Sequence, residues 1–149
     1  MNPSFKHVSW KDLETDPFQR LDKLGMDYPW SKEKWSRLDH SQYQLFGVYE
    51  TETLIGFSLF QAIPGDSQVH LLKITVDQTF HRKGLGAGLL AFALSSFKTM
   101  GIKSCFLEVA IDNRPAISLY HRFGFENLVQ KKRYYSDGKD AYAMQYIID

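Results

Sequence analysis

Glycines and cations cluster between a stretch typical of a strand and one typical of a helix. The segment reads His81-Arg82-Lys83-Gly84-Leu85-Gly86-Ala87-Gly88. Glycine lets a backbone approach a ligand closely, and the unbonded N–H groups at a helix start attract an anion. Arg82 and Lys83 add positive charge. This glycine turn predicts a binding site for an anion such as a pyrophosphate, and a tight strand–helix junction without a ligand is the alternative.

Other glycine-rich phosphate loops have different spacings. A P-loop needs Gly-x-x-x-x-Gly-Lys followed by Ser or Thr, whereas Gly88 is followed by Leu89-Leu90. A dinucleotide fingerprint needs Gly-x-Gly-x-x-Gly, whereas this turn reads Gly84-x-Gly86-x-Gly88. Glu108 does lie where a ribose-binding acid would stand. Several strands precede the turn, however, and the chain has no room for a second nucleotide-binding half, which disfavours a nicotinamide oxidoreductase.

Glu108 is the side chain best suited to accept a proton. Alternation along the strand expected at 105–110 places Phe106, Glu108 and Ala110 on one face. Apolar neighbours favour a raised carboxyl pKa, which suits proton acceptance. A structural carboxylate at a strand end is the alternative.

The single cysteine, Cys105, excludes an intramolecular disulfide and agrees with a reducing compartment. Its apolar strand neighbours predict a buried, unreactive thiol rather than a nucleophile. The sequence has no Cys/His spacing typical of zinc, so we expect no metal.

The overall composition excludes several partners. The net charge of +1 over 149 residues gives no field that favours nucleic acid or an anionic membrane, and the basic runs at 81–83 and 131–133 are short. Residues 1–7 lack the apolar core of a signal peptide. No run approaches the ~18 apolar residues that span a bilayer. We therefore expect a cytoplasmic protein.

Hydrophobic periodicity predicts the elements that hold these residues. Over the first forty residues the spacing is near-helical, with a break at Pro17 and an end at Gly25, and Ser31 can cap a short helix from Lys32. Further along, we expect strands at 45–50, 54–62, 69–77 and 105–110, helices at 84–100 and 115–123, and a hairpin that pairs 127–135 with 141–148.

This order predicts an α/β (α+β) domain with one mixed sheet. The strand–helix–strand unit over 69–110 should form a right-handed parallel crossover, because that is the hand such connections adopt. The remaining strands should pair mostly antiparallel, with helices on the flanks.

The glycine turn resembles the coenzyme A signature of the GNAT acetyltransferase superfamily, Arg/Gln-x-x-Gly-x-Gly/Ala after a strand and opening a helix. The resemblance covers nearly the whole chain, and within the superfamily the chain is most similar to the RimI-type ribosomal-protein alanine N-acetyltransferases. It is carried by Pro29-Trp30-Ser31, Leu107-Glu108-Val109, Asn113, Ala116, Leu119-Tyr120, Phe123-Gly124-Phe125, the run from Tyr134 to Ala141, and Met144.

The resemblance implies a single N-acetyltransferase domain over 1–149 with a GNAT-like fold. It implies direct transfer of an acetyl group from acetyl-CoA to a primary amine, most simply the N-terminal α-amine of a protein. Such an amine titrates at about 7.7–8.0, so a modest base suffices. The alternatives are a small amine or a lysine side chain as acceptor, or a non-catalytic acyl-CoA-binding module.

By the same resemblance, Glu108 is the base and Tyr120 is the acid beside the coenzyme sulfur, although Tyr120 could instead pack and bond a backbone carbonyl. Main-chain N–H groups near Ile74, Thr75 and Val76 should hold the oxyanion. The residues implied to line the cofactor are Ile74, Thr75, Val76, Arg82, Lys83, Gly84, Leu85, Gly86, Ala87 and Asn113.

Two of these implied roles have plain alternatives, and two positions depart from the family pattern. Asn113 could simply cap the helix that begins near Pro115. Tyr134 and Tyr135 should flank an entering peptide, or could be ordinary strand aromatics. His81 stands where the family has Gln or Arg, and Lys73 is atypical in the strand beside the expected acetyl site.

Overall fold

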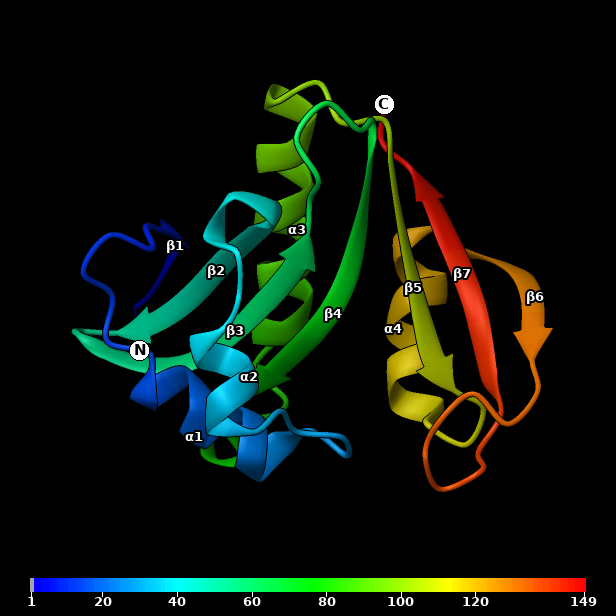
Figure 1. Ribbon diagram of the computed structural model, residues 1–149, viewed down its shortest axis with the longest axis horizontal. Helices are drawn as coiled ribbons and strands as arrows, with labels where there is room; N and C mark the ends of the chain where they lie inside the picture. The colour runs from blue at the N-terminus through cyan, green and yellow to red at the C-terminus, as the bar shows by residue number, and fades with distance from the viewer. Residues whose placement is uncertain (1) are drawn as a thin grey trace.

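The computed structural model describes residues 2–149, which form a seven-stranded sheet in the order β1-β2-β3-β4-β5-β7-β6 (Figure 1). The β4–β5 pair is parallel and the other pairs are antiparallel. The strands are β1 Pro3–Val8, β2 Tyr43–Glu50, β3 Thr53–Gln61, β4 Gln68–Val76, β5 Ser104–Ala110, β6 Glu126–Lys131 and β7 Ala141–Ile147. The helices are α1 Asp16–Gly25, α2 Lys32–Ser36, α3 Leu85–Thr99 and α4 Arg114–Phe123, with 3-10 turns at His40–Gln42 and Gln78–Phe80. The expected mixed, mostly antiparallel sheet with flanking helices is confirmed.

Helices cover both faces of this sheet. On one face, α3 and α4 pack against an apolar cluster centred on Phe46, Phe60 and Phe97, whose rings meet edge to face. On the other face, α1 and α2 cover a smaller cluster that includes Phe18, Trp35 and Phe57 (Figure 1). The stripe predicted for the helix over 84–100 is buried at Leu85, Leu89, Ala93 and Phe97 and packs at Phe92, whereas its last member, Met100, is 49% exposed. The helix also buries Leu90 and Leu94, which the predicted stripe does not include.

The N-terminal segment departs from the prediction. The sequence predicts only helices before residue 44, but Pro3–Val8 forms edge strand β1 and pairs antiparallel with β2. Its polar residues Lys6 and His7 weaken the alternation, and the strand is held by pairing and by Phe5 against Phe92. Pro17 does not break a helix. It lies in the first turn of α1, where its missing N–H costs no hydrogen bond.

The C-terminal hairpin is shorter than predicted. β6 ends at Lys131 rather than at Tyr135, and residues 132–140 connect it to β7. Arg133 adopts a positive φ of 48° just after the strand, and its N–H bonds the Asp140 carboxylate 2.9 Å away. The alternative that Tyr134 and Tyr135 are strand aromatics is therefore wrong, because both lie in the connection.

The parallel crossover opens the sheet in its middle. In the described chain, β4 and β5 pair over three residue pairs, which end at His70 and Phe106. Beyond that point the two strands diverge, and Figure 1 shows them meeting near the C-terminus and separating towards the opposite end. The β4 edge from Leu72 to Val76 therefore has no paired residue on β5.

A bulge at Leu72 changes which way β4 points its side chains. Leu71 pairs with Phe60, but the next pair joins Lys73 to Leu59, so β4 carries one extra residue. Simple alternation would place Lys73 on the α3 face with Leu71. Instead, Lys73 shares the α1 face with His70, and Ile74 packs against the α3 cluster.

Candidate active site

A cleft of about 1520 Å³ lies where β4 and β5 separate. Its walls come from the α1–α2 connection, β4, the glycine turn, β5, α4 and the β6–β7 connection. It brings together nearly all the predicted site residues. Those that line it are Ile74, Thr75, Val76, Arg82, Gly84, Leu85, Gly86, Ala87, Glu108, Asn113, Tyr120, Tyr134 and Tyr135. Lys83 is the exception, because its side chain is exposed outside this lining.

The glycine turn forms one end of the cleft with its backbone amides unpaired. Within residues 2–149, the N–H groups from Arg82 to Ala87 have no hydrogen-bond partner, and the helical pattern starts with the N–H of Gly88. Arg82 and Gly84 both adopt left-handed conformations, with φ of 65° and 73°. A non-glycine residue in this region is strained, and such strain gathers at functional sites. The turn thus presents a row of donors at a helix start, as an anion requires.

The three glycines of the turn have different tasks. Gly84 needs its positive φ, and a Cβ at Gly86 would meet open space. A Cβ at Gly88 would lie 2.6 Å from the Phe5 ring. Gly88 therefore serves the packing of α3 against β1, and only the first two glycines face the place for a ligand.

The turn also explains His81. Its Nε2–H donates to the Val76 carbonyl 2.8 Å away, so the side chain folds back on the end of β4. This contact closes the loop between the strand and the helix. His81 therefore stabilises the turn, and its Nε2 atom is occupied by the Val76 carbonyl.

Glu108 lies at the centre of a polar network. One carboxylate oxygen accepts from His70 Nε2 at 2.6 Å and the other accepts from Lys131 Nζ at 3.0 Å, with 6% of the Glu108 side chain exposed. Desolvation alone would raise the pKa of Glu108, but the hydrogen bonds and charges of His70 and Lys131 outweigh it and lower that pKa to about 2. The expectation of a raised pKa is wrong, because it considered neighbours along the strand rather than neighbours across it.

Sequence reasoning missed His70. Its ring stacks on Phe106 with centroids 4.1 Å apart, which holds the imidazole against β5 beside Glu108. The register of β4 against β5 is what brings the two residues together, since 38 positions separate them in the chain. A histidine followed by a strand bulge carries no local signal of that pairing.

Tyr120 lines the cleft, and Cys105 is buried in the apolar core. Tyr120 is 6% exposed, and its hydroxyl bonds no group among the described residues, so the expected alternative of a backbone carbonyl partner is not seen. Burial, with smaller effects from Cys105 and Tyr135, raises the pKa of the Tyr120 phenol well above its usual range. Cys105 is buried, as predicted, and burial raises the pKa of its thiol to about 12.

An aromatic pair joins the two loops on the opposite wall. Tyr28 and Tyr135 stack with ring centroids 4.4 Å apart and planes 3° from parallel, and the Tyr28 hydroxyl donates to Asp137 at 2.8 Å. Burial and that carboxylate raise the pKa of Tyr28 to about 12, so the hydroxyl keeps its proton near neutral pH. Tyr134 meets Tyr135 edge to face. Tyr28, which the sequence did not single out, thus completes this wall.

Asn113 takes the simpler of its two expected roles, because its side chain caps α4 by accepting from Ala116 N–H at 3.3 Å.

Among residues 2–149 no group of three or more His, Cys, Asp and Glu side chains could hold a metal. No helix in that range is both long and apolar enough to cross a bilayer.

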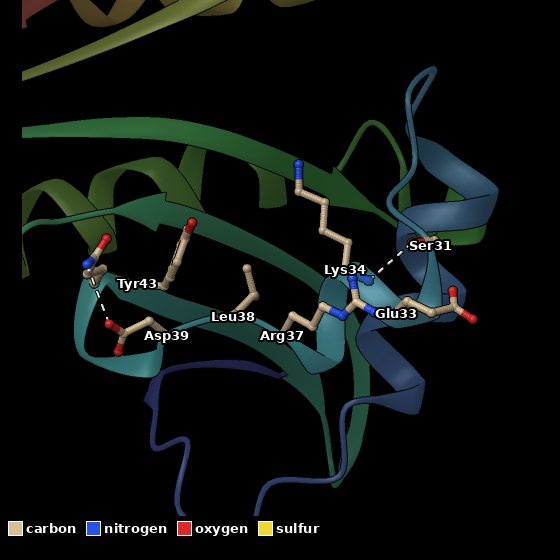
Figure 2. A pocket seen from close by; sticks show the side chains of 8 residues that line it. Ser31, Glu33, Lys34, Arg37, Leu38, Asp39 and Tyr43 are labelled. Carbon is tan, nitrogen blue, oxygen red and sulfur yellow. Dashed lines mark hydrogen bonds between the residues drawn. The ribbon is translucent and has the colours of Figure 1, made fainter.

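A second hollow, of about 510 Å³, lies on the outer side of α2 (Figure 2). Two acidic and two basic side chains surround it, and its outline includes the Ser31 cap of Lys34 N–H. Its lining is Ser31, Glu33, Lys34, Arg37, Leu38, Asp39, Gln42 and Tyr43. None of the predicted site residues is among them.

A model of the acetyltransferase (GNAT) family matches residues 7–125, which include the glycine turn, Glu108 and Tyr120. The chain belongs to this family. Among its GNAT relatives, an N-alpha-acetyltransferase of Sulfolobus acidocaldarius is 41% identical over 91 residues, or 60% of this chain and 54% of that protein. The chain thus spans about half the length of that archaeal relative.

A second GNAT relative covers more of both chains. The [ribosomal protein bS18]-alanine N-acetyltransferase of Escherichia coli K12 is 28% identical over 122 residues, 80% of this chain and 81% of that one. The crystal structure of the Escherichia coli ribosomal-protein-S18-alanine N-acetyltransferase superposes with a TM-score of 0.88 at 24% identity, covering 99% and 95% of the two chains. This likeness establishes the GNAT fold.

Proposed function

We propose that the protein transfers an acetyl group from acetyl-CoA to the N-terminal α-amine of a protein. The observation that carries the proposal is one cleft with unpaired helix-start amides at one end and with Glu108 and Tyr120 in its walls. The names of the archaeal and bacterial relatives support the choice of an α-amine as acceptor.

The residues of the cleft fit acetyl-CoA. The amides from Arg82 to Ala87 suit its pyrophosphate, and the open space at Gly86 admits a phosphate close to the backbone. A volume of about 1520 Å³ exceeds that of a usual small-ligand pocket, ~300–1000 Å³, and leaves room for a long cofactor beside an acceptor. When bound, acetyl-CoA supplies the thioester and carries away the thiolate.

Donors for a developing oxyanion come from the opened strand. Along β4 beyond Leu71, N–H groups on the β5 side lack a strand partner, because the parallel pairing has ended. N–H groups at the level of Ile74 therefore point into the cleft before any ligand arrives. Preorganised donors of this kind stabilise an oxyanion in acyl transfer.

Glu108 meets the acceptor, since it lines the cleft and His70 does not. A full proton transfer from a free α-ammonium to a carboxylate with a pKa of about 2 would be uphill by ~6 units, or ~8 kcal/mol. The Glu108 carboxylate therefore does not take up and keep that proton. It instead orients the neutral amine and accepts a proton only as the nitrogen bonds to carbon and becomes acidic, while His70 holds the carboxylate in place.

Tyr120 supplies the donor on the other side. Because its pKa is raised, its phenol keeps its proton at every physiological pH, and its hydroxyl has no partner in the described protein. It thus has a hydrogen bond to offer to the leaving sulfur. Water completes the protonation, because a thiol titrating near ~8.5 is the stronger acid.

Release of thiol from acetyl-CoA, measured with short peptides that differ in their first residue, tests the proposal. We expect turnover with free α-amines and none with N-blocked peptides that carry lysine. Coenzyme binding without turnover on any amine would point to a non-catalytic module, and turnover on blocked peptides would point to lysine as acceptor. Glu108→Gln and Tyr120→Phe should each slow the reaction, and unchanged rates in both variants would overturn the roles proposed for these two residues.

A further inference from the structure

A buried ion pair under the acceptor side of the cleft is not used by the chemistry above. Lys73 Nζ lies 2.8 Å from Asp22 Oδ1, with 3% of the Lys73 side chain and none of the Asp22 side chain exposed. The second Asp22 oxygen accepts from Trp30 N–H and from the Trp35 indole N–H, each at 3.0 Å. Both oxygens of the carboxylate are thus occupied.

Lys73 also reaches beyond Asp22. Its ammonium donates to the Tyr28 carbonyl at 3.3 Å and lies 4.5 Å from the Trp30 ring centroid. These two contacts belong to the α1–α2 connection, residues 26–31, so one cation on β4 holds both the middle of that loop and the part that leads into α2. Desolvation lowers the pKa of Lys73, and Asp22 opposes that effect.

A buried ion pair contributes little to the net free energy of folding. Moving two charges out of water is costly, and well-packed apolar residues of similar size often stabilise a fold as much or more. A close approach of α1 to β4 is already provided by Gly25, where a Cβ would lie 2.1 Å from Thr75 Oγ1. The ion pair has a different effect: it fixes the position of the Tyr28 backbone relative to β4.

The position of Tyr28 in turn affects the wall of the cleft. Tyr28 lines the cleft, its ring stacks on Tyr135, and its hydroxyl bonds Asp137 of the same β6–β7 connection. Lys73 itself lines the cleft one residue before Ile74. A single chain of contacts therefore runs from the strand that faces the thioester, through Lys73 and Tyr28, to Tyr135.

We propose that Lys73 and Asp22 are positioning residues that fix the Tyr28–Tyr135 stack as the acceptor wall of the cleft. The inference rests on the proposed function. It assigns to the pair an effect on acceptor binding and none on the coenzyme, whose anion site at the glycine turn makes no contact with either residue.

The test is the Lys73→Met variant, with peptide and acetyl-CoA varied separately. We expect the KM for the acceptor peptide to rise about tenfold and the KM for acetyl-CoA to stay within about twofold. The double variant Asp22→Asn/Lys73→Met removes both charges, keeps an oxygen for the two tryptophan N–H groups, and should fold while showing the same split. Lys32→Met is the control, because Lys32 is an exposed cation on α2 that neither lines the cleft nor bonds Asp22.

Tyr28→Ala completes the experiment. If Lys73 acts through Tyr28, adding Tyr28→Ala to the double variant should raise the acceptor KM no further than Tyr28→Ala alone. Additive effects, or equal changes in both KM values, would overturn the inference. If the wild type acetylates no peptide, the proposed function fails instead. A crystal structure of the double variant then decides the inference, which requires the Tyr28 ring to leave Tyr135.

Discussion

Replacing Glu108 with glutamine should remove a pH-dependent part of the stability. Glu108 has an ordinary pKa of 4.5 and a folded pKa of about 2. At ~1.4 kcal/mol per unit, the ~2.5-unit difference stabilises the folded state by ~3 kcal/mol at neutral pH. Because the folded pKa is the lower one, this stabilisation is present above pH 4.5 and is lost as the pH falls through 4.5 towards 2.

Urea unfolding at pH 7 and at pH 3 measures the effect. Between these two values the wild type should lose ~2 kcal/mol of unfolding free energy that the Glu108→Gln variant does not lose. The remaining titrating groups are present in both proteins, so the difference reports Glu108 together with its coupling to His70 and Lys131. Glu52→Gln, in the exposed turn between β2 and β3, serves as the control and should behave like the wild type. Equal losses in wild type and Glu108→Gln would refute the depressed pKa and reopen Glu108 as a strong base.

Four further substitutions separate catalysis, packing and the anion site. Tyr120→Phe should lower kcat by about 10²-fold and leave the unfolding free energy nearly unchanged, because the hydroxyl has no partner to lose; a large loss of stability would contradict this. Gly88→Ala should destabilise by ~1 kcal/mol, since the methyl meets Phe5, whereas Gly86→Ala should keep its Tm and weaken coenzyme A binding in calorimetry; the reverse pattern would exchange the tasks of the two glycines. His81→Ala should weaken coenzyme A binding through a looser turn, and unchanged affinity would show that the Val76 contact is dispensable.

Local chemistry was predictable from the sequence. The glycine turn, the apolar stripe of α3 and the Asn113 cap each depend on residues within one or two turns of chain, and the structure has all three. The faces of β5 were also predictable, because alternation places Cys105, Leu107 and Val109 in the core and leaves Glu108 outside it.

Pairing between distant segments could not be predicted from the sequence. The pKa of Glu108 is set by His70 and Lys131, which reach it from β4 and β6. β1 gains its structure from pairing with β2 rather than from its own pattern. Tyr28 becomes part of the cleft wall through Tyr135, more than a hundred positions away. In each case a partner far along the chain, rather than the local pattern, determines the outcome.

The bulge at Leu72 means that the floor of the cleft depends on a residue count as well as on residue types. Removing one residue there would restore simple alternation. Lys73 would then still pair with Leu59 and face α1, and Ile74 would still face α3, because the bulge holds the one extra residue of β4. A single-codon deletion at Leu72 during evolution would therefore straighten this strand without exchanging its two faces.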